Sequence, residues 1–444
     1  MKQLHTKVWI TFLILVGFVF LTKAQDTLKL TFQEAVSMAL AKNLEYRILE
    51  NNQEILKKET LTAWSNHLPS ANINSSFLRQ TGQQFQQIEG EIVVTKESNE
   101  ILSPGLSVSM PVFNAGRRIL DTQSSILAQK AGEKGLERAR QQVVFDVSRR
   151  YMQVLLDQEL LKIAHENVLN QKQILIQIEG FVEAGLRTIS DLYNQQAEVA
   201  RLESILLDAE LTLENDRWLL VEYLQMEVNT IPVLENVSPE ELMGELSDQD
   251  MDQLVQLALS KRPDLQQQSL LTSSFKKDVQ AIKAMLLPRV NAFYNYGTFY
   301  TSLDNRSVST QLFEIYPQNT IGLSLGIPIF NGFQSRLDVA RGKMAYQNQV
   351  LRKEAFDRKV YQDVRLAYQN YQVALKKVSN ASIRLVAAKE AQQAVSERFR
   401  LGLSDFLDLS AANQTLVSAQ SDQAQANFTL YFQAVLMNFA LGNL

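Results

Sequence analysis

Apolar residues recur every seven positions along two long stretches of the chain, which predicts long helices packed against one another. The series in the first stretch is Val147, Val154, Leu161, Val168, Leu175 and Val182, and one of those in the second is Val360, Ala367, Ala374, Ala381, Ala388 and Val395. A stripe kept to seven residues is typical of helices that supercoil to the left around each other. Proline is absent from Val112 to Ile231 and from Ile329 to Leu444. Because proline ends or kinks helices, we expect uninterrupted helices over roughly Gly116–Ile178 and Phe333–Phe399.

The sequence also matches itself when it is shifted by about 217 to 219 residues. The matching segments, in order, are His67-Leu-Pro69 with Leu286-Leu-Pro288, Gly105–Asn114 with Gly322–Asn331, Gly185-Leu186 with Gly402-Leu403, and Asp191-Leu192 with Asp408-Leu409. Ordered matches at one offset indicate a tandem duplication. We therefore expect a first repeat over residues 25–230, a linker at 231–250 and a second repeat over 251–444. Each repeat should contain a helix (31–65 or 251–285), two strands, a long helix, a tight turn and a shorter returning helix.

Short segments between the helices alternate apolar and polar residues, which predicts strands. The clearest are Leu106–Met110 and Ile321–Ile327, and their partner strands begin just after Pro69 and Pro288. An apolar face opposite a small polar face suits a membrane barrel with lipid outside and water inside, although an ordinary half-buried sheet shows the same alternation. The connections at residues 80–102 and 302–318 are long and polar, so we expect them to be loops.

Four strands per chain are too few to close a membrane barrel. The smallest such barrels have about eight strands, and an open sheet edge cannot face lipid. A barrel would therefore require several chains, with about 8 strands from two copies or about 12 from three.

The first residues have the pattern of a secretory signal. Lys2 and Lys7 precede the apolar run Val8–Thr22, which ends in Thr22-Lys23-Ala24. This pattern predicts a cleaved signal peptide over residues 1–24, and the alternative is an N-terminal anchor helix. No later segment holds about 20 uninterrupted apolar residues, so the sequence predicts no transmembrane helix.

Composition then narrows the possible functions. The chain has 444 residues, no cysteine, three histidines and a formal charge of −4. Without cysteine there are no disulfides, thiolate metal sites, cysteine nucleophiles or acylated cysteine anchor. The few histidines leave little for catalysis or metal binding, and the charge gives no support to nucleic-acid binding. Gly322-Leu-Ser-Leu-Gly326 fits a nucleophile elbow, but it lies within a predicted strand. We therefore expect no enzyme, no cofactor and no metal.

These segments together resemble the outer-membrane efflux proteins, the TolC-like outer-membrane channels. The likeness runs from about Leu28 to Leu444 and rests on the paired Leu-Pro strand starts, the Gly-Leu-Ser…Phe-Asn segments and the Gly-Leu…Asp-Leu helix tips. It implies a mainly α fold with a membrane β-barrel. In the implied homotrimer, duplicated long-helix hairpins form an α-barrel across the periplasm. Four strands per chain contribute to a 12-stranded β-barrel in the outer membrane of a Gram-negative bacterium.

The resemblance also implies a function and partners. The trimer would be the passive exit duct of a tripartite efflux or type I secretion system, with an iris-like gate at the periplasmic helix tips. Its partners would be a periplasmic adaptor (membrane fusion protein), through it an inner-membrane transporter, and outer-membrane lipid. The alternative from a different class is a secreted periplasmic coiled-coil scaffold without a channel.

The same resemblance assigns roles to residues at the tips. Gly185, Leu186, Gly402 and Leu403 match the turns that contact the adaptor. The gate candidates are Asp191, Asp408, Asp405, Arg187 and Phe399.

Three positions depart from the family pattern of the gate. Phe399 stands where family members have a tyrosine, Ser404 stands where an arginine is expected, and Ala411 stands where a second acidic ring is expected. Asp405 and Arg187 are the residues that would compensate.

Two physical roles remain open for the acidic tip residues. In a three-fold duct, Asp408 would form a ring of carboxylates, which favours cations in a narrow aqueous pore. Alternatively, Asp191 and Asp408 stabilise the first turns of the returning helices by their charge. Plain helix capping is likewise the alternative role for Gly185 and Gly402.

Overall fold

The computed structural model describes residues 29–88, 90–95, 98–227, 230, 232–235 and 250–444. The expected signal peptide at residues 1–24 lies outside the described residues, as does most of the expected linker at 231–250. Internal contacts divide the chain into two compact units. The first unit comprises the chain up to Glu50, Leu136–Pro263 and Asp357–Leu444, and the second comprises Asn51–Gly135 and Asp264–Phe356.

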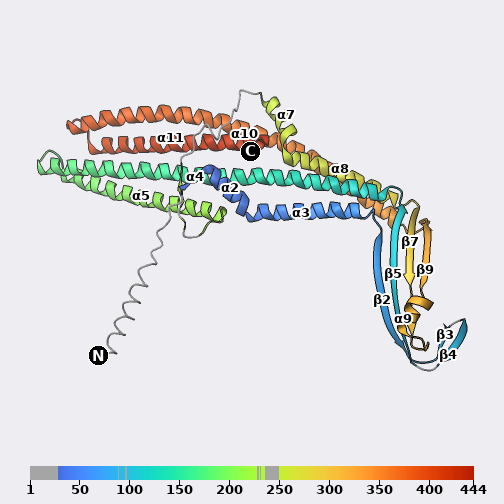
Figure 1. The fold of residues 1–444 in the computed structure, drawn as a ribbon. Coiled ribbons are helices and arrows are strands. Elements are labelled where there is room, and N and C mark those ends of the chain that lie inside the picture. The colour runs from blue at the N-terminus through green and yellow to red at the C-terminus, as the bar shows by residue number, and fades with distance from the viewer. Residues whose placement is uncertain (1–28, 89, 96–97, 228–229, 231, 236–249) are drawn as a thin grey trace, which may run out of the picture. The chain divides into compact units, whose positions relative to one another are not determined.

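Helices account for most of the described residues (Figure 1). Their bounds are α2 (Phe32–Lys42), α3 (Leu44–Ser65), α4 (Arg117–Glu183), α5 (Ile189–Tyr223), α7 (Met251–Lys261), α8 (Pro263–Ala284), the short turn α9 (Val308–Thr310) followed by the π-helix η1 (Gln311–Ile315), α10 (Gln334–Arg400) and α11 (Phe406–Leu441). None of the helices in these described ranges combines the length and the apolar content that a bilayer crossing requires.

The two long helices confirm the sequence prediction. α4 and α10 each have 67 residues, which corresponds to about 100 Å at 1.5 Å per residue. Each starts one residue after the expected position, and they end five residues and one residue beyond the expected ends. α5 and α11 return alongside the ends of α4 and α10 (Figure 1).

The two shorter expected helices are each interrupted once. α2 ends at Lys42. The side chain of the next residue, Asn43, accepts a hydrogen bond from the Tyr46 N–H at 2.9 Å and so caps the start of α3. α7 ends at Lys261, because Pro263 disfavours the helical conformation of Arg262, the residue before it.

The core of the first unit surrounds the buried side chain of Tyr151 on α4. Its hydroxyl lies 2.9 Å from the Leu30 carbonyl oxygen and 2.8 Å from that of Glu235. These carbonyls belong to a parallel pair of short strands, β1 (Lys29–Leu30) and β6 (Val233–Leu234), and to the residue after it. Burial raises the pKa of Tyr151 to about 12, so the hydroxyl stays a donor. The other core residues include Ala35, Ala39, Val143, Val147, Val154, Leu155, Leu213, Leu220 and Leu224.

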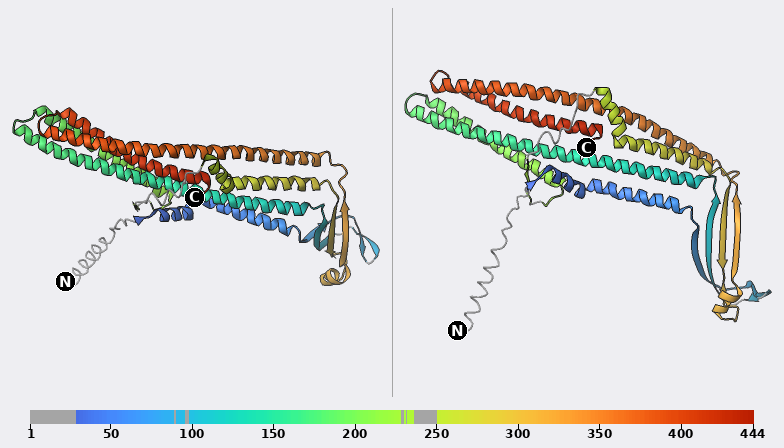
Figure 2. Two further views of the ribbon diagram at one scale, coloured as in Figure 1. Left: turned by 90° about the horizontal axis from the view of Figure 1, so that it is seen from above. Right: turned by 45° about the horizontal axis from the view of Figure 1, so that its top comes forward.

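The second unit contains an antiparallel sheet (Figure 2). Its order is β2 (Ser70–Gln80), β5 (Asn99–Phe113), β7 (Arg289–Gly297) and β9 (Gln318–Gly326), with β8 (Tyr300–Thr301) paired to the end of β5. The expected strands are all present, but the expected loops hold further structure. The first contains a hairpin of β3 (Gln84–Ile88) and β4 (Glu91–Thr95), and the second contains α9 and η1.

The register of this sheet places residues of one kind in rows across all four strands. One row is Ala71, Val108, Tyr294 and Ile321, and the next is Asn72, Ser107, Asn295 and Thr320. Because neighbouring residues of a strand point to opposite faces, one face of the sheet is apolar and the other is mainly small and polar. Phe293 is one large apolar residue on the polar face, as are Leu78 and Ile101 in the outer part of the sheet. A Cβ added at Gly322 would lie 2.6 Å from the Phe293 ring. Among the described strands, β2 and β9 each pair on one side only.

Candidate functional site: the tips of the helical hairpins

Both hairpin tips use the same helix-ending geometry. Gly185 and Gly402 have φ values of +71° and +76°, the left-handed conformation that glycine adopts without strain. The N–H of the next residue donates to a carbonyl oxygen five residues earlier, at 2.8 Å in both tips. The next residues, Leu186 and Leu403, have side chains that are 70% and 66% exposed. Each tip therefore exposes an apolar side chain directly after the glycine of its turn.

Acidic residues cap the returning helices just after these turns. At the start of α5, the Thr188 N–H donates to Asp191, and the Asp191 N–H donates to the Thr188 hydroxyl, both at 3.2 Å. At the start of α11, Asp405 accepts from the Asp408 N–H at 2.9 Å, and the Ser404 hydroxyl donates to Asp408 at 2.9 Å. These bonds satisfy N–H groups that the first turn of a helix leaves unpaired. Asp191 and Asp405 thus cap their helices, whereas Asp408 lies in the first turn of α11 and accepts from the Ser404 hydroxyl.

Arg187 joins the two tips of one chain. Its guanidinium donates to the carbonyl oxygens of Phe399 at 2.8 Å and Ser404 at 3.2 Å. It also lies 4.1 Å from the centroid of the Phe399 ring. Among the described residues it makes no ion pair with Asp405 or Asp408. Arg187 therefore acts on the backbone of the second tip rather than on its carboxylates.

The Phe399 ring is buried between the hairpins. It is 5% exposed and packs in a cluster with Ile178, Phe406 and Leu409. A phenylalanine suits this place because the ring is surrounded by apolar side chains and by the face of a guanidinium. The structure thus places Arg187 and Phe399 in contact, whereas the family resemblance of the sequence predicted only that both lie at the helix tips.

Two pairs of amides close to the tips were not singled out by the sequence. Gln195 on α5 is 1% exposed and donates to the backbone and side-chain oxygens of Gln171 on α4 at 2.9 and 3.0 Å. In the second hairpin, Gln392 donates to Asn413 at 3.0 Å. Gln392 interrupts an otherwise mainly apolar series of residues spaced by seven. This interruption is the feature of the sequence that could have predicted a polar contact inside the hairpin.

The remaining candidate chemistry has structural explanations. Among the described residues, no three or more His, Asp or Glu side chains are arranged to hold a metal ion. His67 lies 3.1 Å from the Thr122 hydroxyl and links α3 to α4. The Gly322–Gly326 segment lies inside β9, where Ser324 is opposite Asn291, so it does not form the strand-to-helix turn of a nucleophile elbow.

Comparison with known proteins gives one consistent result. A family model described as outer membrane efflux protein matches residues 35–224 and again 254–443. The outer membrane protein TolC of Vibrio cholerae is 24% identical over 357 residues, which is 78% of each chain. Among solved structures, CusC aligns over 96% of this chain and 95% of its own, with a TM-score of 0.81 and 17% identity. The CmeC outer membrane channel of Campylobacter jejuni aligns over 93% and 85%, with a TM-score of 0.77 and 17% identity.

Proposed function

Because this chain belongs to the outer membrane efflux protein family, we propose that three copies form a duct through the outer membrane and periplasm. Members of this family are outer-membrane efflux channels and not enzymes, and the long helices form the periplasmic portion. The channel works as part of an efflux system. The trimer, the closed barrel and the identity of the partners are the parts that we propose.

The four-stranded sheet is the observation that carries this proposal. Its apolar face is exposed, and the side chains of Ile321, Leu323 and Leu325 are 86%, 72% and 65% accessible. A soluble protein rarely leaves such a surface uncovered. Among the described strands, the edge strands β2 and β9 each pair on one side only, which leaves the other side available to another chain. Lipid would cover the apolar face, and pairing of β9 with β2 of the next copy would give 12 strands without an open edge.

Apolar stripes on the described helices are also exposed. Leu337, Met344 and Leu351 on α10 are spaced by seven, and their side chains are 45%, 52% and 61% exposed. Leu207 and Leu211 on α5 form a similar exposed pair. A heptad stripe on a long helix is buried against another helix in a coiled coil. We assign these stripes to contacts with neighbouring copies in an α-barrel.

We further propose that each chain is two repeats joined by a linker. The first repeat would span residues 25–230, the linker 231–250 and the second repeat 251–444. Two matches of the same family model, 219 residues apart at their starts, support this division. Three copies of a duplicated chain would then give a ring of six hairpins of similar structure.

The tips are proposed to dock the adaptor and to gate the duct. Leu186 and Leu403 would insert into a periplasmic adaptor that connects the duct to an inner-membrane transporter. Arg187 would keep the duct closed by holding the two tips of each chain together. In the ring, Asp191 and Asp408 would add negative charge around the opening, in addition to their local roles in the first turns of α5 and α11.

Arg187→Ala tests the gate. Hydrogen bonds from a charged group to partly exposed carbonyls contribute about 1–3 kcal/mol, which corresponds to a roughly 5–150-fold shift of the closed-to-open ratio. We expect a matching rise of open probability in planar bilayers. Arg201→Ala, which removes an arginine paired with Glu198 away from the tips, is the control. Equal open probability in both variants would contradict the gate role.

The duct itself is tested by electron microscopy of the full chain extracted from membranes in detergent. A hollow three-fold particle is expected. A monomer or a two-chain rod that stays soluble without detergent would overturn the barrel and the trimer, and would favour the coiled-coil scaffold.

A further inference from the structure

We propose that Asp157 and Asp216 share one proton and thereby make the α4–α5 hairpin sensitive to pH. Asp157 lies on α4 and is 4% exposed. Asp216 lies on α5, half-buried, with its carboxyl within hydrogen-bonding reach of Asp157. Both residues are away from the tips. The inference depends only on the hairpin and holds whether or not the chain forms a duct.

The register of the hairpin brings the two carboxyls together. On one side of them, the Tyr223 hydroxyl lies 3.5 Å from Asp146. On the other side, Lys172 and Glu203 form an ion pair at 2.6 Å. Each of these contacts also joins α4 to α5, and the two aspartates lie between them along both helices. Their approach is therefore a consequence of antiparallel packing.

The hydrogen bonds of Asp157 require a proton. Its Oδ1 accepts from the Gln153 side-chain amide at 3.1 Å, whereas its Oδ2 is enclosed and has no donor. A buried carboxylate oxygen without a donor is costly, and a second carboxylate beside it adds repulsion. One proton between the two carboxyls removes both problems. In agreement, burial and the neighbouring Asp216 raise the pKa of Asp157 to about 7.

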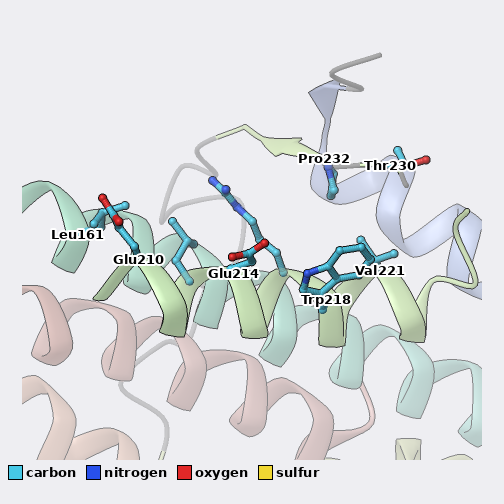
Figure 3. Close-up of a pocket in the computed structure, with 9 residues that line it drawn as sticks. Leu161, Glu210, Glu214, Trp218, Val221, Thr230 and Pro232 are labelled. Carbon is cyan, nitrogen blue, oxygen red and sulfur yellow. The ribbon is translucent and has the colours of Figure 1, made fainter. Parts of the chain in front are cut away.

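The nearby arginines do not neutralise the pair. Arg150 stacks on the Tyr223 ring at 4.2 Å, and its Nη1 has no hydrogen-bond partner. Arg217 lines a hollow of about 190 Å³ together with Glu214 and Trp218, which lie along the same helix (Figure 3). Its Nε likewise has no partner. Among the described residues, neither guanidinium makes an ion pair with the two aspartates.

Among the described residues, the ion pairs of the other elements around this core do not involve the two aspartates. α11 packs against the same core through Phe428, and its charged residues are Asp408 and Asp422. Asp408 lies in the first turn of α11 and accepts a hydrogen bond from the Ser404 hydroxyl, and Asp422 pairs with Arg384. On α2, which also packs here, Glu34 is engaged by Thr31, and Lys42 is exposed in the last turn of the helix. With no third carboxylate or histidine completing a metal site among the described residues, a proton is the ligand that the pair fits.

The direction of the pH effect follows from these two states. An exposed aspartic acid loses its proton near pH 4, whereas the closed hairpin keeps it until about pH 7. Between these values the closed state binds one proton more than the open state. The ratio of closed to open hairpins is therefore highest at acid pH. It falls by up to about tenfold per pH unit as the pH rises to about 7, and it does not change further above that pH.

Amide hydrogen exchange of the full chain in detergent tests the pair. Peptides around Asp157 and Asp216 are followed from about pH 5 to 8, with rates corrected for intrinsic exchange. Protection should fall by up to about a hundredfold between pH 5 and 7. Asp157→Asn should remove this dependence, because its amide donates to Asp216 at every pH. Asp146→Asn, on the same helix beside Tyr223, should retain it. Retention of the full dependence in Asp157→Asn would overturn the proposal.

A second measurement reads the proton directly. Infrared difference spectra between about pH 5 and 8 should contain a protonated-carboxyl band in the full chain, and Asp157→Asn should lose it. Its absence from the unmodified chain would refute the shared proton, whatever the exchange data show.

Discussion

Replacing Ile321 with arginine tests which face of the sheet meets lipid. Ile321 is the fourth of nine residues in β9, and its row across the sheet contains Ala71, Val108 and Tyr294. If this face meets lipid, Ile321 lies near the middle of the hydrocarbon layer. An arginine at that depth costs about 2–4 kcal/mol in a membrane barrel. Three copies in one assembly raise the cost to roughly 6–12 kcal/mol, which is comparable to the whole stability of a domain.

Thr320→Arg provides the matched control. Thr320 is the preceding residue of the same strand, so it lies at nearly the same depth on the opposite face. Its row contains Asn72, Ser107 and Asn295. An arginine there would extend into water and cost little, although it should change the ion selectivity of the pore by adding three positive charges.

The assay is assembly in the outer membrane and resistance of the purified oligomer to urea. Ile321→Arg should lower the amount of assembled oligomer and its urea midpoint, whereas Thr320→Arg should assemble like the unmodified chain. Equal assembly of both variants would show that neither face meets lipid. A loss confined to Thr320→Arg would show that the faces are reversed.

Two further predictions concern single residues outside the sheet. Gly442→Ala should destabilise the first unit by about 1–2 kcal/mol, because Gly442 has a φ of +79° and an added Cβ would lie 3.0 Å from the Arg262 Cα. Thermal unfolding measures this loss, and an unchanged unfolding midpoint would contradict the prediction. Asp304→Asn should loosen the connection between β7 and β9, because Asp304 accepts hydrogen bonds from the Arg306 guanidinium at 2.9 and 3.0 Å. Those bonds hold the pKa of Asp304 well below its usual range, so in the unmodified chain their contribution is present at neutral pH and is lost only as the pH falls through that lowered value. Limited proteolysis at neutral pH should cleave the variant faster here, and equal rates would refute the role.

The periodic features of this protein were readable from the sequence because they are local. Helix or strand geometry decides which positions share a face, so a spacing of seven predicted α4 and α10, and a spacing of two predicted β5 and β9. The positions of the prolines predicted the limits of the long helices, because proline lacks the backbone N–H that a helix needs and therefore interrupts a helix in any tertiary context. The loops were predicted less well. The hairpin of β3 and β4 lies inside a segment that was expected to be a loop, since its polar content concealed the strands.

The pairing of residues distant in sequence was decided only by the tertiary structure. The sequence identified Arg187 as a gate candidate, but its partners are backbone carbonyls more than 200 positions away, which no side-chain pattern reveals. Asp157 and Asp216 were not singled out, because each looks like an ordinary solvated residue of its own helix. Only the packing of α4 against α5 removes water from one carboxyl and places the other beside it. Periodicity in the sequence specifies which face of a helix or strand is buried. Which atoms that face meets depends on how two elements are aligned, and contacts over the whole length of the hairpin set that alignment.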